Sequence, residues 1–490
     1  MSSSAPFDLE AAARQSMIEH GFEPEYPAQV KQELAALQAH LPKTPASVAD
    51  LRHLLWSSID NDTSRDLDQV EYAETLPDGS TRVLIGIADV DAYVPKGSAI
   101  DKHASVETVT VYTGVENFSM LPDELSTDLT SLLEGQDRAC MVTEFTLDKN
   151  VCATESCVAS SRIYPALVKN KAQLAYNGVG AWLDGKAEAP AKVAASNELQ
   201  EQLKLQNEIA RRLRLERYKN GALDISTIET YAIVQGKTID LEALRKNSAT
   251  ELIEDFMIAA NGVVARTLQA KRIASIRRIV RTPRRWDRIV ALAAGHQWKL
   301  PAEPDSKALN DFLSQRKKDD PDHFPDLSLA IVKMLGPGEY VLERPDDPPQ
   351  GHFGLAVEDY THSTAPNRRY ADLVTQRLLK SMIAGKPSPY SDEELSAIAL
   401  NCTTKSAAER KVEREMQKRI AAVALSNRIG DKFHAIVTGV TAGGTFVRTL
   451  DPHVDGMLVR GQHGVDVGDR LNVQLVHTDP VRGYIDFARA

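Results

Sequence analysis

A dense run of aspartates near residue 60 constrains this chain more than any other feature. Residues 59–69 read I-D-N-D-T-S-R-D-L-D-Q, and the aspartates are Asp60, Asp62, Asp66 and Asp68. Carboxylates a few ångströms apart repel one another by about 1 kcal/mol per pair in water, and by more when they are buried. A divalent cation removes this repulsion, and oxygen ligands at this density favour Mg²⁺ or Mn²⁺. The alternative for a short acidic segment is a solvated turn, so the rest of the chain must decide between the two.

The composition predicts an ordinary globular protein without membrane segments. The chain has 490 residues, of which 26% are charged and 42% hydrophobic, a size that allows about two to four domains. No apolar run is long enough to cross a bilayer, and residues 1–6 do not open a signal peptide. The cysteines Cys140, Cys152, Cys157 and Cys402 form no C-x-x-C pair and are expected to be reduced thiols. We therefore expect a cytoplasmic monomer with no membrane partner, and the sequence identifies no protein partner.

Two basic segments reverse the net charge of −10 locally. Residues 271–288 hold eight basic residues and one acid, and a second basic set consists of Arg368, Arg369, Arg377 and Lys380. A run of charge is usually a solvated face. Two such runs in a chain that also has a candidate metal site raise a second interpretation, a track for nucleic-acid phosphates.

Patterns along the chain divide it into four parts and predict a multidomain α+β protein. Residues 1–50 read as two short helices, which form either a structural cap or a helix-turn-helix. Residues 51–385 begin with strand patterns and continue with helices. Residues 386–427 are expected to be a helical connector. Residues 428–490 alternate like the strands of a small five-stranded OB-fold barrel.

Three further segments match a known family in order and spacing. They are V-L-I-G-I-A-D-V-D-A-Y-V-P-K-G-S at residues 83–98, F-S-M-L-P-D-E-L-S at residues 118–126 and H-F-G-L-A-V-E-D-Y-T-H-S-T-A-P-N-R-R-Y-A-D-L at residues 352–373. Together with the aspartates, these segments resemble the RNase II family of exoribonucleases over residues 54–379. The barrel is similar to the OB-fold RNA-binding domain that commonly ends chains of this family.

The resemblance implies a fold and an activity. The fold would be a short helical N-terminal segment, an RNase II-type (RNB) mixed α/β catalytic domain and a C-terminal OB-fold barrel. The activity would be metal-dependent hydrolysis of single-stranded RNA from its 3′ end, with release of nucleoside 5′-monophosphates.

For the metal, the resemblance implies Asp60, Asp66 and Asp68 as ligands of Mg²⁺, with Asp68 also a catalytic residue. Mn²⁺ is expected to substitute for Mg²⁺ in such a site. Asp62 lies off the family pattern and is expected to be a solvated or turn-capping residue. The family's run usually ends D-x-D-D, whereas this chain has Gln69 in the last position. An amide oxygen can bind a cation without adding charge, or orient a metal-bound water, so one metal and two metals both remain open.

For catalysis and RNA contact, the resemblance implies further residues. Arg368 would contact the scissile phosphate, because a guanidinium fork fits phosphate oxygens and stays charged. Tyr176 would position the water or the phosphate. Tyr112 would stack near the 3′ end, and Glu254 would accept from the ribose 2′-hydroxyl, with Asp255 as the alternative one position on.

Three more residues are candidates for binding RNA outside the catalytic centre. Arg369 would face away from Arg368 in a helix, which makes a salt bridge its alternative role. Phe446 and Arg460 of the predicted barrel are candidates for base stacking and phosphate contact, and Phe433 is expected in the barrel core.

The missing fourth carboxylate leaves a second function open. The chain could be an RNA-binding protein with an impaired nuclease site. A third interpretation, a DNA-binding regulator, depends only on the two N-terminal helices.

Overall fold

The computed structural model describes residues 7–43, 45, 48–148, 158–226, 229–235, 238–244, 246–321 and 323–490. Cys152 and Cys157 lie outside these ranges. The other two cysteines, Cys140 and Cys402, are buried free thiols, as expected. In the described part of the chain, no helix combines the length and the apolar character needed to span a bilayer.

A curled sheet of six strands forms the centre of the larger domain, in the order β1-β8-β2-β3-β4-β7. These strands are β1 (Ala49–Asp50), β2 (Trp56–Asp60), β3 (Gln69–Thr75), β4 (Thr81–Ala88), β7 (Asp137–Leu147) and β8 (Val158–Ala175). The first part of β8 pairs antiparallel with β7, and its last part pairs parallel with β2. The sheet therefore closes back on itself through this one long strand.

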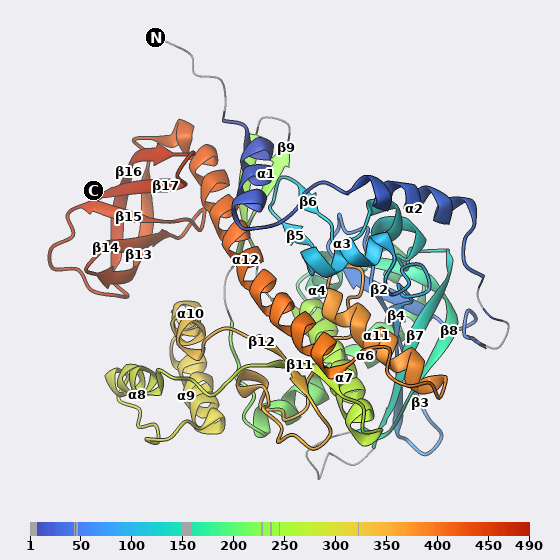
Figure 1. Cartoon of the computed structure of the whole chain (residues 1–490). Helices are drawn as coiled ribbons and strands as arrows, with labels where there is room; N and C mark the ends of the chain where they lie inside the picture. The colour runs from blue at the N-terminus through green and yellow to red at the C-terminus, as the bar shows by residue number, and fades with distance from the viewer. Residues whose placement is uncertain are drawn as a thin grey trace.

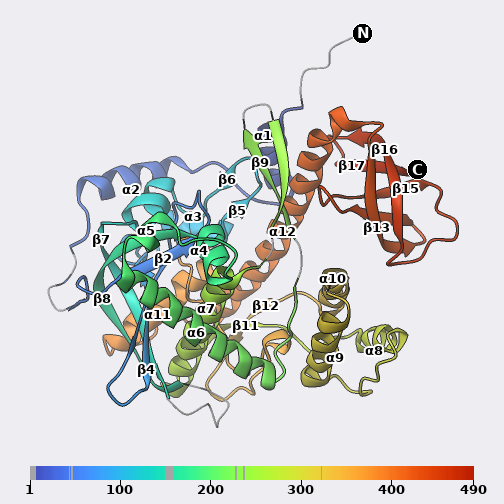
Figure 2. The same ribbon diagram turned by 180° about the vertical axis from the view of Figure 1, so that it is seen from behind.

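Helices cover both faces of the sheet (Figures 1 and 2). One face packs against α3 (Ala99–Glu107), α11 (Tyr370–Ile383) and the first part of α12 (Asp392–Ala424), and the other against α4 (Tyr176–Leu183), α6 (Asn197–Lys219) and α7 (Ser248–Ala270). Successive strand residues point to opposite faces. In β4, for example, Leu84 belongs to the first core and Ile85 to the second. The near-continuous apolar sequence of this strand follows from burial on both sides.

The remaining elements surround this body. They are α5 (Ala191–Ala194), α8 (Trp286–Gly295), α9 (Ser306–Asp319), α10 (Phe324–Leu335), β5 (Val111–Tyr112), β6 (Asn117–Phe118), β9 (Glu229–Gln235), β10 (Thr238–Leu244), β11 (Ser275–Ile279), β12 (Glu339–Glu343), a π-helix η1 (Leu125–Leu129) and the 3₁₀ turns η2 (Phe353–Leu355) and η3 (Ser426–Arg428). Helices α8, α9 and α10 pack around a small core of their own, beside the C-terminal barrel (Figure 1).

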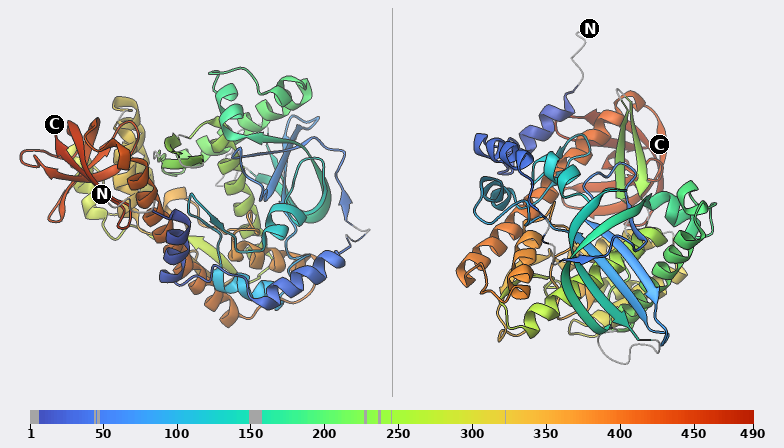
Figure 3. Two further views of the ribbon diagram at one scale, coloured as in Figure 1. Left: turned by 90° about the horizontal axis from the view of Figure 1, so that it is seen from above. Right: turned by 90° about the vertical axis from the view of Figure 1, so that its right-hand side faces the viewer.

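The long helix α12 joins the two domains and belongs to the core of each. It begins at a capping box formed by Ser391 and Glu394. Near this end Leu395 packs in the core of the larger domain, and near the other end Ala422 packs in the barrel core. Figure 3 shows the helix running from the sheet domain to the barrel. The segment expected as a connector is thus a packed structural element.

The two N-terminal helices lie apart from each other (Figure 1). Helix α1 (Leu9–Glu19) packs against α12, whereas α2 (Ala28–Ala39) packs against α3. The two helices contact different parts of the protein and do not form a helix-turn-helix pair.

The C-terminal domain is a closed barrel of five strands, in the order β13-β14-β15-β17-β16. The strands are β13 (Lys432–Thr441), β14 (Gly444–Thr449), β15 (Asp455–Arg460), β16 (Arg470–Asp479) and β17 (Tyr484–Arg489). Alternating residues fill the interior, among them Phe433, Val447 and Phe487. Both the expected α+β class and the expected five-stranded barrel are confirmed.

Candidate active site

The aspartate run forms the loop between β2 and β3, at one edge of the curled sheet. Asp60 is the last residue of β2 and pairs with Ala175, the last residue of β8. Tyr176 follows at the start of α4. Because β2 and β8 run parallel, both strands end at the same edge and bring Asp60 and Tyr176 together. Burial raises the pKa of Tyr176 above its usual range, and the charge of Asp60 adds to this effect.

Asp68 connects this loop to the T-A-P-N-R-R segment. Its Oδ1 accepts the backbone N–H of Asn367 at 3.1 Å, and its Oδ2 accepts Nε–H of Arg368 at 3.1 Å. Asp68 is 1% exposed, and burial raises the pKa of its carboxyl to about 7 although Arg368 opposes the shift. The fold thus pairs two motifs that lie 300 residues apart in the sequence.

Arg368 keeps most of its guanidinium free. Its side chain is 44% exposed, and the structure gives neither of its Nη nitrogens a hydrogen bond to a described residue. Burial would lower the pKa of Arg368, but the carboxylates of Asp68, Asp60 and Asp66 outweigh it and raise the pKa. The two Nη nitrogens are therefore charged donors available to an anion.

Tyr112 lies beside the third aspartate. Its Oη donates to Oδ2 of Asp66 at 2.7 Å, and its side chain is partly exposed. The hairpin of β5 and β6 that carries Tyr112 packs through Val111 and Phe118 against Met17 of α1 and Met416 of α12. Helix α1 therefore helps to hold Tyr112 at the aspartates.

Between the two alternatives for a ribose contact, Glu254 is accessible and Asp255 is not. Glu254 is 45% exposed on α7, receives Nζ of Lys246 at 2.6 Å, and lies close enough for its charge to act on Tyr176. Asp255 is 2% exposed and forms ion pairs with Arg217 and Arg214 of α6. Asp255 thus connects two helices.

Arg369 lies at the start of α11, in extended backbone conformation. Its guanidinium donates to both oxygens of Asp372, with Nε at 2.8 Å from Oδ2 and Nη2 at 2.7 Å from Oδ1. It also lines a cavity of about 260 Å³ together with Arg278 and Glu409. Helix α11 therefore starts at Tyr370, after both arginines.

Two arginines of the basic segments are buried in ion pairs and are not available to phosphates, whereas others, such as Arg284, are exposed, so the phosphate track stays a hypothesis. Arg277 is 2% exposed and pairs with Glu343 at 3.0 Å, and Arg377 is 3% exposed and pairs with Asp101 at 2.7 Å. The sequence shows the basic residues as a run but gives no sign of these acidic partners, which come from distant segments.

On the barrel, the two candidate RNA contacts lie at the surface. Phe446 of β14 is 38% exposed, opposite Met457 in the neighbouring strand. Arg460, at the end of β15, is exposed. Phe433 is buried against Phe487, as expected for a core residue.

Sequence reasoning missed Glu71. It lies in β3 two residues after Gln69, and both are buried. Burial raises the pKa of Glu71 well above its usual range, and the charge of Asp60 adds to the shift. The available signal was a glutamate inside the buried strand sequence Q-V-E-Y-A, next to the aspartate run.

The oxygen ligands of the aspartate loop fit a hard divalent cation. Asp60, Asp66 and Asp68 offer carboxylates and Gln69 an amide, with no histidine or cysteine in residues 59–69. Over the described ranges, no group of three or more His, Cys, Asp or Glu side chains converges in a geometry that could hold a metal ion. The fit therefore lies in the type of donor: Mg²⁺ takes oxygen ligands, keeps several waters and shares its coordination with substrate phosphates.

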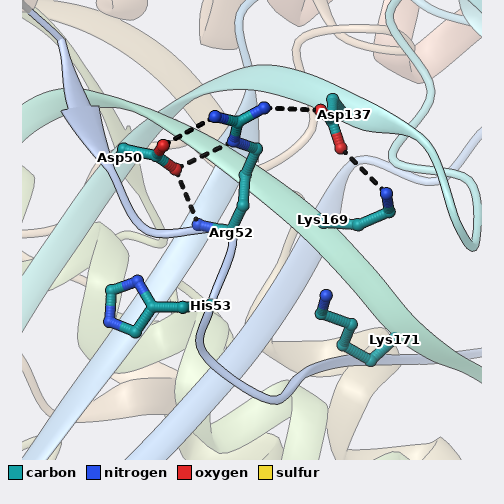
Figure 4. A pocket seen from close by; sticks show the side chains of 6 residues that line it. All are labelled: Asp50, Arg52, His53, Asp137, Lys169 and Lys171. Atoms are coloured by element: carbon teal, nitrogen blue, oxygen red, sulfur yellow. Dashed lines mark hydrogen bonds and ion pairs between the residues drawn. The ribbon is translucent and has the colours of Figure 1, made fainter.

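A larger surface depression lies elsewhere, at the outer edge of the sheet near β1 (Figure 4). It has a volume of about 420 Å³. Arg52 binds Asp50 at 2.6 Å and Asp137 at 2.7 Å, and Lys169 binds Asp137 at 3.2 Å. Arg52 and Lys169 are thus engaged by carboxylates, and Lys171 also lines the depression.

Comparison with protein families covers most of the chain. A model described as the RNB domain matches residues 48–385, and a model described as the RNase II-type exonuclease C-terminal S1 domain matches residues 431–490. Ribonuclease R of Thermotoga maritima is 30% identical over 501 residues, covering 94% of this chain and 68% of that protein. Exoribonuclease 2 of Escherichia coli O6:K15:H31 is 30% identical over 410 residues, covering 82% of this chain and 61% of that protein. Against five proteins named ribonuclease R, the chain spans 52% to 68% of their length.

Solved structures show the same fold. Mycoplasma genitalium RNase R in complex with ribose-methylated single-stranded RNA superposes with a TM-score of 0.84 at 25% identity, covering 99% of this chain and 78% of that one. Yeast Ssd1, described as a pseudonuclease, has a TM-score of 0.70 at 17% identity, covering 96% of this chain and 58% of that one. The second likeness concerns the fold alone.

Proposed function

The chain belongs to the RNB-domain family, and from this premise we propose that it is a metal-dependent exoribonuclease. It would degrade single-stranded RNA from the 3′ end and release nucleoside 5′-monophosphates. The names of its relatives, ribonuclease R and exoribonuclease 2, support this class of activity. The residues in the aspartate loop support the reaction type.

One observation carries the proposal: the contact between Asp68 and Arg368. It places a buried carboxylate and a partly exposed guanidinium side by side at 3.1 Å. Hydrolysis of a phosphodiester needs negative charge to hold a cation and positive charge to hold the phosphate. The contact provides both in one place, with Asp60 and Tyr176 at the adjoining strand ends.

Asp60, Asp66 and Asp68 would hold Mg²⁺, and Mn²⁺ would substitute for it. When bound, such an ion polarises the phosphate and lowers the pKa of a coordinated water. Arg368 would bind the non-bridging phosphate oxygens through its free Nη nitrogens, fixing the phosphate relative to the carboxylates. The raised pKa of Tyr176 keeps its hydroxyl protonated at neutral pH, so it would donate a hydrogen bond to the phosphate or the water.

Two residues near the aspartates would select RNA. The ring of Tyr112 is partly exposed while its hydroxyl bonds Asp66, so the ring would stack on a base near the 3′ end. Glu254 would accept a hydrogen bond from a ribose 2′-hydroxyl, which DNA lacks. It is exposed and its charge reaches Tyr176.

The barrel would add affinity away from the reaction. Phe446 would stack on a base and Arg460 would bind a phosphate, which are sequence-tolerant contacts for single strands. Arg369, whose guanidinium is engaged by Asp372, would affect RNA binding through the structure at the start of α11.

A direct assay tests this function. RNA labelled at the 3′ end and RNA labelled at the 5′ end are incubated with the purified protein, with and without Mg²⁺, and the products are resolved by length. Early release of labelled mononucleotide from the 3′ end, and stepwise shortening of 5′-labelled RNA, are expected only with the cation. Cleavage in the interior of the RNA would contradict the proposal.

A second function is kept because of Gln69. An amide in place of the family's fourth carboxylate lowers the negative charge of the loop. On this alternative the protein binds RNA without cleaving it. RNA that stays intact at every Mg²⁺ and Mn²⁺ concentration, while still bound, would favour the alternative.

A further inference from the structure

Glu71 is a buried carboxylate that the proposed reaction does not use. It lies within β3 and is 0% exposed. Throughout the described residues, neither of its oxygens has a hydrogen-bond partner. An isolated buried carboxylate is costly, and native proteins rarely keep one unless a cation or a proton meets it.

The side chain of Ser57 shares this condition. Ser57 lies directly opposite Glu71 in the antiparallel pairing of β2 and β3, so both side chains are on the same face of the sheet. Ser57 is also 0% exposed, and its Oγ has no partner in the described part of the chain. The structure contains no hydrogen bond between the two side chains, so the Ser57 hydroxyl and both Glu71 oxygens face each other without partners among the described residues.

Two groups of the aspartate loop extend this oxygen-rich patch. Gln69 and Glu71 are two residues apart in β3, and therefore lie on the same face. Asp60 is close enough for its charge to act on Glu71. The chain thus has an amide at position 69 and a carboxylate at position 71, two residues further along and on the same face of β3. The charge of Asp60 acts on that carboxylate.

We propose that Glu71 supplies the carboxylate of a second divalent-cation position beside the one formed by the aspartates. The Oγ of Ser57 and the amide oxygen of Gln69 are its neutral oxygen donors. A cation here satisfies the unpartnered oxygens and turns the repulsion between Asp60 and Glu71 into two attractions. This inference deepens the proposed function and rests on it, because it assigns a residue to a metal that the reaction would use.

Metal binding to the whole chain, without RNA, tests the assignment. Isothermal titration with Mn²⁺, together with electron paramagnetic resonance to count bound Mn²⁺, is compared for the native protein and Glu71→Gln. The native protein should bind two ions, and Glu71→Gln should bind the weaker of them at least tenfold less tightly. Mn²⁺ should also raise the melting temperature of Glu71→Gln less than it raises that of the native protein, because the variant binds one ion fewer.

A rescue separates a ligand from a residue that merely fills space. The double variant Gln69→Asp with Glu71→Gln moves the carboxylate from position 71 to position 69. It should bind the second Mn²⁺ ion again. As a matched control, Glu107→Gln changes another buried glutamate, at the end of α3, whose Oε1 accepts the backbone N–H of Glu23. This control should bind Mn²⁺ like the native protein.

The outcomes show separately whether the role assigned to Glu71 is wrong and whether the proposed metal-dependent function is wrong. If Glu71→Gln binds Mn²⁺ with native number and affinity, Glu71 is a protonated core residue and the inference is wrong. If the native protein binds no Mn²⁺ at all, both the proposed metal-dependent function and the inference about Glu71 are wrong. If Asp68→Asn loses the tighter ion and Glu71→Gln the weaker one, both stand.

Discussion

The catalytic domain and the barrel place their functional candidates in opposite ways. In the catalytic domain, Asp68 is 1% exposed and its partner Arg368 comes from a segment 300 residues away. In the barrel, Phe446 is 38% exposed and its neighbour across the strand pair is Met457, 11 residues on. The first arrangement requires the whole domain to fold, whereas the second needs only adjacent strands.

This difference separates two kinds of contribution to one activity. Buried charges that satisfy one another act as a unit, so the loss of one group leaves the others uncompensated. Exposed stacking and phosphate contacts add affinity in small, nearly independent steps. Large all-or-none effects are therefore expected in the catalytic domain and graded effects in the barrel.

The largest effect is expected from Asp68→Asn. The substitution keeps the size of the side chain but removes one charge of the metal site, so the cleavage rate should fall by about a thousandfold or more, in the range typical of a lost catalytic group. The affinity for RNA should change by less than about threefold, since most contacts lie elsewhere. Rates are measured on a short labelled RNA and affinities by fluorescence anisotropy.

Asp62→Asn is the matched control for that variant. Asp62 is exposed in the same loop and lies off the family pattern. It should cleave at the native rate. If Asp62→Asn instead is the inactive variant, the assignment of the metal ligands is shifted along the loop.

A smaller loss of rate is expected from Arg368→Lys. Lysine keeps the charge but loses the planar fork, which binds phosphate oxygens in two places. The rate should fall about 100- to 1,000-fold, as for one lost transition-state donor, and single-turnover kinetics should place the loss in the chemical step. A variant that loses RNA affinity and keeps its single-turnover rate would move Arg368 from the reaction to the binding of RNA.

Graded effects are expected in the barrel. Phe446→Ala should weaken binding of a long single strand by about tenfold, because one base–aromatic stack contributes about 1–3 kcal/mol. Arg460→Ala should lower the slope of log affinity against log salt by about 0.7, the value for one lost phosphate contact. Val467→Ala, at another exposed position of the barrel, should change neither quantity. Equal loss in all three variants would point to a damaged barrel.

The smallest effect concerns stability in acid. Hydrogen bonds from Arg82, Arg162 and Tyr164 outweigh burial and lower the pKa of Glu144 to about 2, from an ordinary value of 4.5. A carboxyl whose pKa is lowered in the folded state stabilises the fold above its unfolded pKa and loses that contribution as the pH falls. Glu144→Gln should therefore lower the melting temperature by a few degrees at pH 7, and the difference should vanish between about pH 4.5 and 2.

Glu188→Gln provides the comparison for this acid titration. Glu188 is an exposed glutamate of the same domain, and its replacement should leave the melting temperature unchanged at every pH. A Glu144→Gln difference that persists at pH 2 would mean that the shape of the side chain, and not its charge, stabilises the sheet.

The barrel and the sheet strands were predictable because local alternation of apolar residues encodes them. In β14, Val447 points inward while Phe446 points outward, and this pattern is visible in the sequence. The aspartates and Arg368 were also predictable, through their motifs. The contact of Arg368 with Asp68 at 3.1 Å is a property of the fold that follows from neither motif alone.

The misread features have a common cause. Arg277 belongs to a run of basic residues, but its partner Glu343 lies on β12, the neighbour of β11 in the sheet. Glu71 looked like an ordinary strand residue because its burial depends on α4, α6 and α7, which cover that face. In both cases, the decisive neighbour of a charged side chain comes from a distant part of the sequence, which periodicity and charge runs do not reveal.

The separation of chemistry from affinity is the central claim, and one experiment tests it most directly. Asp68→Asn and the double variant Phe446→Ala with Arg460→Ala are compared with the native protein for binding of a long RNA and cleavage of a four-nucleotide RNA. Asp68→Asn should bind the long RNA and leave the short one intact, whereas the barrel variant should bind weakly and cleave the short RNA at the native rate. A folded barrel variant that fails to cleave the short RNA, or an Asp68→Asn protein that cleaves it at close to the native rate, would contradict the account.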